Sequence, residues 1–313
     1  MPGGHVKIVA VSMIGNEADV VECFVRHTLK LVDRLVIILH RSVDGTADIV
    51  RSLKEEGLPI QIEPVRFEGF SQGREMSFVA KALLAHTDHT IRANYVVPLD
   101  ADEFLKLPSA DYLQRALPAV PGEYFAATRW QNYFPMQVDD LINAHTLRAI
   151  THCRQDDNDP CYKVMLSPGF LHDRASLFEG SHCVMWETQT GHKPAPCIEL
   201  KAIRLAHFPV RSRFQLARKA HIGALAKSLT SGNATAGLGT HWQGLLEQVT
   251  THTDMTFERL QSVAFHYPQT FCADGAIDES MIAHSPMACN FDLRYSHLIR
   301  TDLEGILADW VRA

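Results

Sequence analysis

An apolar run of strand length, from Tyr95 to Leu99, ends in three carboxylates, Asp100, Asp102 and Glu103, and the chain then turns apolar again. A buried strand that delivers acids at its carboxyl end is how an open α/β sheet builds a ligand site. Two carboxylates separated by one residue can also share a divalent cation that holds a diphosphate. This stretch therefore predicts both a fold class and the position of a site.

Acidic pairs at this spacing also arise by chance, and the chain contains a second example in Asp157 and Asp159. That second pair lies in a purely polar stretch, so we interpret it as part of a solvated loop. The apolar strand in front of Asp100 is therefore what makes the first pair a candidate site.

The chain before this stretch alternates between apolar strands and amphipathic helices. Strands are expected over 6–13, 35–39 and 60–67, and each is followed by a turn and a helical pattern. Strands that are apolar throughout are typical of parallel sheets, which helices cover on both faces. Together with the strand before Asp100, this alternation predicts an α/β fold with a doubly wound, mainly parallel sheet and right-handed crossovers.

The pattern after residue 102 is less regular. A capping box from Ser212 to Gln215 is expected to begin a helix that runs towards Leu229. We predict an α/β domain over 1–230 and a mainly helical C-terminal extension over 231–313. Further strands are expected over 123–134, 162–166, 177–184 and 199–206, with a polar loop over 185–194 that is long enough to act as a lid.

Composition excludes some classes of protein. A formal net charge of -6 over 313 residues argues against a general nucleic-acid-binding protein, because phosphate contacts need a basic surface. No apolar run approaches transmembrane length, and the first residues lack the long apolar region of a signal peptide. The seven cysteines form no Cys-x-x-Cys pair and are expected to be reduced. We therefore expect a cytoplasmic protein, with peripheral membrane contact and the oligomeric state left open.

Four motifs occur in a fixed order along the chain. Asn16-Glu17 follows the first expected strand, and 42–46 (Ser-Val-Asp-Gly-Thr) follows the second. The acidic stretch 100–105 (Asp-Ala-Asp-Glu-Phe-Leu) comes next, and 207–212 (His-Phe-Pro-Val-Arg-Ser) lies far downstream. With this ordered set the chain resembles the family 2-type glycosyltransferases of the A-type nucleotide-sugar fold, in the branch whose acidic motif continues as Asp-Glu-Phe. The resemblance covers about residues 6 to 220.

The resemblance implies a nucleoside-diphosphate sugar as donor and a carbohydrate or glycolipid as acceptor. It implies that Asp44 contacts the base or ribose of the nucleoside, and that Asn16 and Glu17 line the same pocket. Many relatives carry Lys before Asn-Glu, whereas this chain has Gly15, so the detail of that turn departs from the family pattern.

The resemblance also implies a metal centre. Asp100 and Asp102 would hold Mn²⁺ or Mg²⁺ against the diphosphate, and His207 would match the late histidine that many such enzymes add to the metal shell. His182 is the second choice among the 17 histidines. Sugar transfer needs such an ion independently of the resemblance, because a divalent cation neutralises the leaving diphosphate as a Lewis acid.

Basic residues at helix starts are candidates for binding phosphate. Arg74 follows Gly73 at the start of an expected helix, and Arg211 precedes another. Arg218 and Lys219 lie on that second helix together with Arg213. For these three, an ordinary basic face on an acidic protein is the preferred interpretation, whereas Arg211 is assigned to the diphosphate. Arg74 is assigned to a phosphate as well, with a solvated arginine at a helix end as the equal alternative.

The reaction also needs a base that takes the proton of the acceptor hydroxyl. Glu187, at the opening of the expected lid, and Asp140 are the candidates, with Glu179 as a further alternative. For each of them, a solvated surface acid is the preferred interpretation. Trp130 and Trp186 either stack on a sugar ring or pack in the core, which is the more common fate of a tryptophan.

We therefore expect a metal-dependent glycosyltransferase of hexosyl or related type, with inversion implied by the resemblance and surface polysaccharide biosynthesis as the usual setting. A sugar-phosphate nucleotidyltransferase would use a similar sheet. Such enzymes usually have a Gly-rich loop with a basic residue after the first strand, and 13–17 (Met-Ile-Gly-Asn-Glu) is not one. A non-catalytic nucleotide-sugar-binding protein is the third hypothesis, although the acidic motif is intact.

Overall fold

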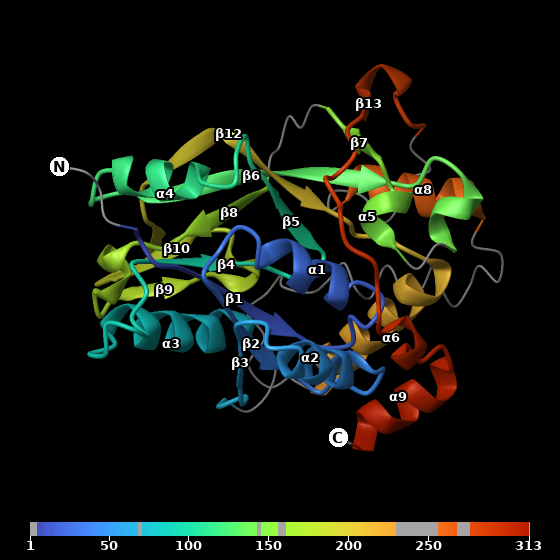
Figure 1. Cartoon of the computed structure of the whole chain (residues 1–313), viewed down its shortest axis with the longest axis horizontal. Coiled ribbons are helices and arrows are strands. Elements are labelled where there is room, and N and C mark those ends of the chain that lie inside the picture. The colour runs from blue at the N-terminus through green and yellow to red at the C-terminus, as the bar shows by residue number, and fades with distance from the viewer. Residues whose placement is uncertain are drawn as a thin grey trace.

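The computed structural model describes residues 5–67, 71–142, 145–155, 161–229, 256–267 and 276–312. Within these residues the strands form a four-stranded parallel sheet, a six-stranded mixed sheet and a small three-stranded antiparallel sheet. In Figure 1 the parallel sheet lies below the mixed sheet, and the acidic stretch links the two. The predicted α/β class with a largely parallel N-terminal sheet is confirmed.

The parallel sheet has the strand order β3-β2-β1-β4. Its strands are apolar because both faces are covered. Ile8 and Ala10 pack with helices α1 and α2 in one core cluster, whereas Val9 and Val11 pack with helix α3 in another. Helices on both faces make this part doubly wound. The bounds are β1 (Ile8–Ile14), β2 (Arg34–Leu39), β3 (Ile60–Glu63), β4 (Tyr95–Pro98), α1 (Val21–Thr28), α2 (Thr46–Glu55) and α3 (Gln72–Ala85).

The mixed sheet has the order β13-β7-β6-β12-β5, and β8 pairs with β6 beside β7. Strand β12 runs parallel to β6 and antiparallel to β5. The turn after β4 therefore leads directly from one sheet into the other, which places Asp100 and Asp102 at their junction. The bounds are β5 (Glu103–Lys106), β6 (Phe125–Phe134), β7 (His152–Arg154), β8 (Tyr162–Met165), β12 (Cys197–His207) and β13 (Ile282–His284).

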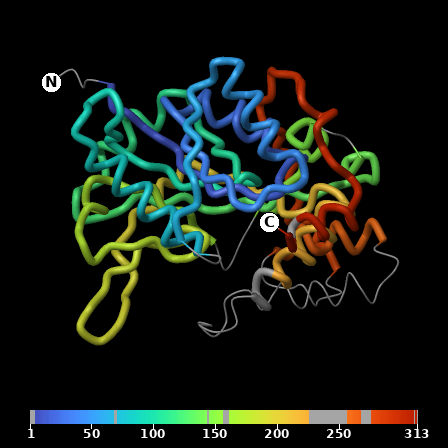
Figure 2. The backbone as a smooth tube through the Cα atoms, turned by 90° about the horizontal axis from the view of Figure 1, so that it is seen from below, coloured from blue at the N-terminus to red at the C-terminus, as the bar shows by residue number. Residues whose placement is uncertain are grey.

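The third sheet corrects two predictions. A strand over 177–184 is wrong, because Gly180 and Ser181 have positive φ angles of 72° and 55° and interrupt it between β9 (Ala175–Leu177) and β10 (Val184–Thr188). A polar loop over 185–194 is also wrong, because β10 pairs with β11 (Gly191–Pro194) as a hairpin. Figure 2 shows the yellow chain around this hairpin projecting from the body of the molecule.

Helix α6 (Arg213–Leu229) has the predicted bounds, and Ser212 Oγ accepts a hydrogen bond from the backbone N–H of Gln215 at 3.0 Å, which is one half of the predicted capping box. The side chain of Gln215 accepts from the N–H of Arg211 at 3.0 Å instead of from that of Ser212. Its buried Leu216 and Ala220 pack with α8 in a third core cluster. The remaining helices are α4 (Tyr112–Ala116), α5 (Thr146–Ala149), α8 (Phe257–His266) and α9 (Leu303–Arg312), with 3₁₀ turns over Leu117–Ala119, Val138–Leu141, Pro168–Leu171, Glu179–Ser181, Glu279–Met281 and Ser296–Leu298.

The described part of the C-terminal extension is helical in α8 and α9, whereas 276–302 is mostly irregular chain that contains β13 and two 3₁₀ turns. This irregular chain runs along the N-terminal half (Figure 1). The carboxylate of Glu22 accepts backbone hydrogen bonds from Arg294 and Tyr295 at 3.0 to 3.1 Å. These contacts join the extension to α1, and the boundary at residue 230 stays a prediction.

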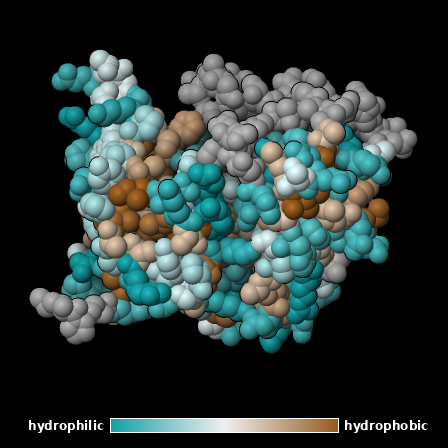
Figure 3. All heavy atoms as spheres, turned by 90° about the horizontal axis from the view of Figure 1, so that it is seen from above, coloured by the Kyte–Doolittle hydropathy of each residue, from teal (hydrophilic) through white to brown (hydrophobic). Residues whose placement is uncertain are grey.

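Mostly hydrophilic side chains cover the face seen in Figure 3, with apolar side chains in small groups between them. Within the described ranges, the helices are too short or too polar to serve as a membrane span.

Candidate functional site

The acidic turn after β4 is fixed from both sheets. The backbone N–H of Leu99 donates to Val11 of β1 at 3.0 Å, and the N–H of Phe208, just after β12, donates to the carbonyl of Asp102 at 2.9 Å. Within the turn, the N–H of Glu103 donates to Asp100 at 3.1 Å. The turn is therefore held in one position by main-chain bonds at two strands that are about two hundred residues apart in sequence.

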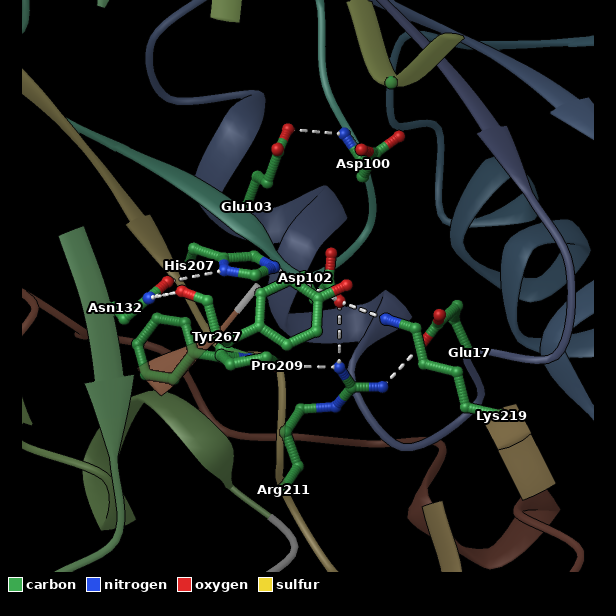
Figure 4. Close-up of polar contacts among 12 residues, drawn as sticks. Glu17, Asp100, Asp102, Glu103, Asn132, His207, Pro209, Arg211, Lys219 and Tyr267 are labelled. Carbon is green, nitrogen blue, oxygen red and sulfur yellow. Dashed lines mark hydrogen bonds and ion pairs between the residues drawn. The ribbon is translucent and has the colours of Figure 1, made fainter. Parts of the chain in front are cut away.

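Asp102 is buried at the centre of a charged cluster (Figure 4). Its Oδ2 lies 2.7 Å from Nζ of Lys219, 3.5 Å from Nη1 of Arg211 and 3.9 Å from Nε2 of His207. Burial by itself would raise the pKa of Asp102, but the neighbouring cations, Lys219 above all, outweigh burial and hold that pKa well below its usual range. Asp102 is therefore a carboxylate anion at neutral pH.

His207 is oriented by Asn132 on the neighbouring strand. Nδ1 of His207 lies 2.8 Å from Oδ1 of Asn132, whose Nδ2 donates to the carbonyl of Tyr267. This arrangement places the imidazole proton on Nδ1 and leaves the lone pair of Nε2 facing Asp102. The ring also stacks on Trp130 at 4.1 Å between centroids. Burial lowers the pKa of His207 to about 3, so the imidazole is neutral.

Arg211 and Arg218 connect Asp102 to the turn after β1. Nε of Arg211 lies 2.7 Å from Asp19, and its Nη2 pairs with Glu17. Arg218 lies 3.1 Å from Asp19 and 2.8 Å from Asp44, and both arginine side chains are almost fully buried. Burial opposes the charge of Arg211, but Asp19 and Glu17 outweigh it and raise the arginine pKa further. The start of α6 thus places three cations among these acids.

Asp100 belongs to a second charged cluster. Its Oδ2 lies 2.7 Å from Nζ of Lys163, and its Oδ1 accepts from Gln72 at 2.6 Å. Lys163 also lies 2.9 Å from Glu103 and donates to the carbonyl of Gly180 at 2.7 Å. Burial raises the pKa of Glu103 to about 8 against the opposing charge of Lys163. Of the three acids in the motif, Asp100 is the exposed one, at 28%.

The two turns that were predicted to bind the nucleoside, at Asn16 and at Asp44, lie near the Asp102 cluster. Their side chains, however, bond to other residues of the protein. Asn16 has a positive φ of 58°, and its amide bridges Arg41 and Val43 at 3.1 and 3.0 Å. Asp44 is fully buried, accepts from Ala18 at 3.1 Å and pairs with Arg218. The structure therefore brings Glu17 and Asp44 to the Asp102 cluster through Arg211 and Arg218, whereas the side chain of Asn16 bonds to Arg41 and Val43. Asp44 has no surface for a ligand while Arg218 of α6 covers it.

Two other predicted residues have clear structural partners. The guanidinium of Arg74 is exposed and lies 3.9 Å from the ring centroid of Phe67, as a cation–π pair. Asp140 is buried, and its Oδ2 accepts backbone bonds from Met136 and Gln137 at 2.8 and 3.1 Å. Asp140 is therefore a turn-capping residue in this structure, and among the described residues neither Arg74 nor Asp140 is hydrogen-bonded or ion-paired to Asp102.

The remaining candidates lie on the small sheet or beside it. Glu187 is exposed on β10, opposite His192 in the hairpin. Glu179 accepts from the backbone N–H of Gly73 at 3.2 Å at the start of α3, and burial raises its pKa. His182 faces the carbonyl of Tyr162 at 2.8 Å. Within the described part of the chain, none of these three side chains hydrogen-bonds or ion-pairs with Asp102.

Of the two tryptophans predicted either to stack on a sugar or to pack in the core, one lies at the candidate site and the other does not. Trp186 packs on Phe125 at 6.2 Å and on His172 at 5.1 Å between ring centroids, which is a packing role. Trp130 is also buried, but it stacks on His207 and so forms one wall of the candidate site.

Sequence reasoning missed Lys163, Asn132 and Asp19. Lys163 carried a readable signal, because it interrupts an otherwise apolar strand and a buried lysine needs an acidic partner. Asn132 and Asp19 carried none, since their roles depend on His207 and Arg211, which lie far away in sequence.

No protein-family model and no curated protein matches the chain. Among solved structures, the mannosyltransferase PcManGT from Pyrobaculum calidifontis, in complex with GDP-Man and Mn²⁺, is similar over 84% of this chain and 74% of its own, with a TM-score of 0.40 and 15% identity. GalNAc-T7 with UDP, GalNAc and Mn²⁺ is similar over 85% of this chain, with a TM-score of 0.36 and 11% identity. This chain spans 58% of the length of the second structure. At these TM-scores the likeness carries no weight, and the function has to be argued from the side chains of this chain.

The donor set around Asp102 fits a divalent cation that binds together with a phosphate ligand. Asp102 Oδ2 and His207 Nε2 are two lone-pair donors 3.9 Å apart. In the described part of the chain, no three His, Cys, Asp or Glu side chains converge into a complete protein shell. A hard cation such as Mg²⁺ usually takes one or two carboxylates and completes its shell with waters and substrate phosphates. The predicted ligand Asp100 is turned to Lys163 and Gln72 instead.

Proposed function

We propose that this protein is a glycosyltransferase that moves a hexosyl or related group from a nucleoside-diphosphate sugar to the hydroxyl of a carbohydrate or glycolipid acceptor, with inversion, in polysaccharide biosynthesis. The observation that carries the proposal is the pair of Asp102 and His207. An anionic carboxylate faces the lone pair of a neutral imidazole, at the junction of the two sheets and beside the turn after β1. Two electron-rich groups placed in this way call for a cation between them.

Asp102 and His207 would hold Mn²⁺ or Mg²⁺, with Asn132 keeping the imidazole in the required tautomer. When bound, the ion would act as a Lewis acid on the leaving diphosphate. Asp100 stays in the proposal as the accessible acid of the motif, at 28% exposure, on the side where the sugar would lie. Negative charge there would favour a transition state that resembles an oxocarbenium ion.

The cations of α6 supply the second half of the site. Arg211, Arg218 and Lys219 now pair with Glu17, Asp19, Asp44 and Asp102. Guanidinium groups bind phosphate oxygens in bidentate fashion, and charge-assisted bonds of this kind are the strong ones. We propose that Arg211 and Lys219 turn to the diphosphate on ligand binding, and that α6 moves away from Asp44 so that this carboxylate and Asn16 reach the nucleoside.

We keep Glu187 as the proposed base for the acceptor hydroxyl. It is solvent-exposed on the hairpin, whereas the carboxylate of Asp140 is engaged by two backbone N–H groups. Glu187→Gln should lower kcat at least about tenfold, the usual contribution of a positioned base being 10²–10⁴, without weakening nucleotide binding. If kcat is unchanged in Glu187→Gln, then Glu187 is not the base and another acid must take the proton of the acceptor hydroxyl.

Thermal shift with nucleoside diphosphates tests the proposal. A ligand that binds only the folded state raises Tm, so UDP or GDP should stabilise the protein with Mn²⁺ present and not with EDTA. Asp102→Asn and His207→Gln should both abolish this metal-dependent shift. Asp48→Asn, which removes an exposed carboxylate of α2, is the matched control and should retain it.

His207→Gln guards against a folding artefact, because it replaces a neutral side chain and leaves no buried charge without a partner. A normal metal-dependent shift in both Asp102→Asn and His207→Gln would refute the proposal. So would the lack of any shift in the wild-type protein across a panel of nucleoside diphosphates and nucleotide sugars.

A further inference from the structure

Two cysteine thiols lie at the two nitrogens of one imidazole, where the irregular chain after β13 passes α5 and α1 (Figure 1). Cys23 belongs to α1, His145 immediately precedes α5, and Cys289 lies on the irregular chain. Sγ of Cys23 is 3.7 Å from Nδ1 of His145, and Sγ of Cys289 is 3.2 Å from Nε2. With Arg148 of α5 these residues form a thiol cluster, and the proposed sugar transfer uses none of them.

The proton of the imidazole distinguishes the two thiols. Burial lowers the pKa of His145, so the ring is neutral at pH 7 and carries one proton. Its Nε2 is 3.1 Å from the carbonyl oxygen of Phe291, which can only accept, so the proton is on Nε2. Nδ1 then accepts from the thiol of Cys23, whose pKa burial raises to about 12. Cys23 therefore donates to the ring, whereas the sulfur of Cys289 faces the Nε2–H group.

The sulfur of Cys289 faces a second donor. The guanidinium of Arg148 hydrogen-bonds to it, donates to the carbonyl of Phe291 at 2.7 Å and pairs with Asp292 at 2.9 Å. As a donor, the thiol of Cys289 has a contact of only 3.8 Å, to the carbonyl of Phe291. Two N–H groups directed at one sulfur favour its thiolate form, because hydrogen bonds to an ionised acceptor are the stronger ones. The thiolate is the nucleophilic form of cysteine.

Cys289 is also accessible and has positively charged neighbours. Its side chain is partly exposed, whereas that of Cys23 is buried. The ammonium of Lys30 lies 4.7 Å from the ring centroid of Phe291, so Lys30 and Arg148 approach the Cys289 segment from two sides. The acid beside them, Asp292, is paired with Arg148 and is 87% exposed. An anionic reagent that approaches Cys289 would therefore meet two cations and two N–H donors.

We propose that Cys289 is a modification site that undergoes thiol–disulfide exchange with an anionic small-molecule disulfide. The Cys289 thiolate attacks one sulfur of the reagent, the reagent's S–S bond breaks, and a new S–S bond forms between Cys289 and one half of it. The other half leaves with the electron pair of the broken bond and takes up the proton that Cys289 has lost. The disulfide is thus the oxidant, and an added thiol reverses the step.

The test uses glutathione disulfide, which has a net negative charge, on the full-length reduced protein at pH 7 and low ionic strength. Peptide mass spectrometry follows the modification of each cysteine with time. We expect the mixed disulfide to form at Cys289 at least about tenfold faster than at Cys197, and dithiothreitol to remove it. Cys197 is the internal control, because it is exposed, but partial burial and the charge of Glu199 raise the pKa of its thiol.

Two variants test the role of the cations. Arg148→Gln should slow the reaction of Cys289 at least about tenfold, because it removes both a donor and a charge. Lys30→Gln removes a charge and keeps the bonds to the Phe291 carbonyl, so it should slow the reaction about threefold. Arg115→Gln on α4 is the matched control: it removes an arginine that is 67% exposed and pairs with Asp111, and the rate should not change. Urea midpoints check that each variant folds.

A comparison of reagents tests the charge of the partner. Cystamine is a small disulfide with a net positive charge. The ratio of the rate with glutathione disulfide to the rate with cystamine should be higher at Cys289 than at Cys197, which lies beside Glu199. The difference between the two cysteines should shrink in 0.5 M salt, since salt screens exposed charges.

Three outcomes would overturn the inference: a reaction at Cys289 that is no faster than at Cys197, an unchanged rate in Arg148→Gln, or a higher charge preference for cystamine at Cys289 than at Cys197. A disulfide between Cys289 and Cys23 as the main product would overturn the assignment of Cys23 as an unreactive hydrogen-bond donor. The inference does not depend on the proposed function, because none of these measurements involves a nucleotide, a metal or sugar transfer.

Discussion

The ammonium of Lys163 lies 2.9 Å from the carboxylate of Glu103, and neither side chain is exposed by more than 1%. The same ammonium reaches Asp100 and the carbonyl of Gly180, both at 2.7 Å. Lys163 on β8 thus bonds to two acids of the turn after β4, Asp100 and Glu103, and fixes their positions. Removing one member of a buried ion pair leaves an uncompensated charge, which is far more damaging than removing the whole pair.

Because burial raises the pKa of Glu103 to about 8, Lys163→Met should destabilise the protein by about 3–5 kcal/mol in urea unfolding at pH 9, where Glu103 is ionised. Adding Glu103→Gln should recover part of this loss, because the buried carboxylate then has no charge to compensate. Equal losses in the single and the double variant would contradict a direct coupling between the two residues.

Gly45 begins α2 with a φ of 99°, and a Cβ there would meet the carbonyl oxygen of Leu298 at 2.1 Å. Gly45→Ala should cost at least about 2–3 kcal/mol, because backbone strain adds to a clash with main chain. Gly57→Ala is the matched control: its φ is 88°, but nothing lies within 4 Å, so only the strain of about 1–2 kcal/mol remains. Limited proteolysis should detect release of the chain around Leu298 in Gly45→Ala alone.

Stability should fall in acid through Glu56, which accepts two bonds from Arg26 at 3.0 and 2.7 Å. These bonds lower the pKa of Glu56 from its ordinary 4.5 to about 2. A lowered carboxylate pKa stabilises the fold above about pH 4.5, and this contribution is lost as the pH falls towards 2. The difference in the free energy of unfolding between the wild type and Glu56→Gln should therefore become smaller over that window. For the control Glu55→Gln, which changes an exposed carboxylate, the same difference should not change with pH. A constant difference for Glu56→Gln would exclude the pair as an acid-sensitive contact.

Asn132 should act on metal binding as a positioning residue, through the tautomer of His207. Asn132→Ala should weaken Mn²⁺ binding in the presence of a nucleoside diphosphate by about 10–100-fold, as loss of such a partner usually does. Asn132→Asp keeps an acceptor oxygen for Nδ1 and should restore most of the affinity. A purely structural role predicts equal loss in both variants, which calorimetric Mn²⁺ titration would reveal.

The parallel half of the fold was predictable because its signals are local. Strand β1 is apolar on both faces, and α6 has the predicted bounds because Ser212 caps it. The interruption at Gly180 and Ser181 was not predictable, since a serine with positive φ follows from the packing around it and not from its type. Local patterns therefore give elements, whereas turns within the small sheet depend on tertiary context.

The candidate site was predicted in part for the same reason. Asp102 and His207 are brought together as the order of the motifs indicated. Asp44 was predicted to contact the nucleoside, but in the structure it pairs with Arg218. The sequence could not reveal this pair, because Arg218 is 174 residues away and its burial against Asp44 depends on the path of α6. An ion pair between residues that are far apart in the sequence cannot be predicted from the local sequence pattern around either residue.

The ionic cluster at the start of α6 has a consequence for how ligands enter. In the described residues, Arg211, Arg218 and Lys219 are each already paired with acidic side chains there, and His207 is neutral. A diphosphate would therefore bring negative charge that these cations do not fully balance unless a positive ion arrived with it. Nucleotide and divalent cation should therefore be taken up as a unit, and the apparent nucleotide affinity should rise in proportion to the concentration of free divalent ion.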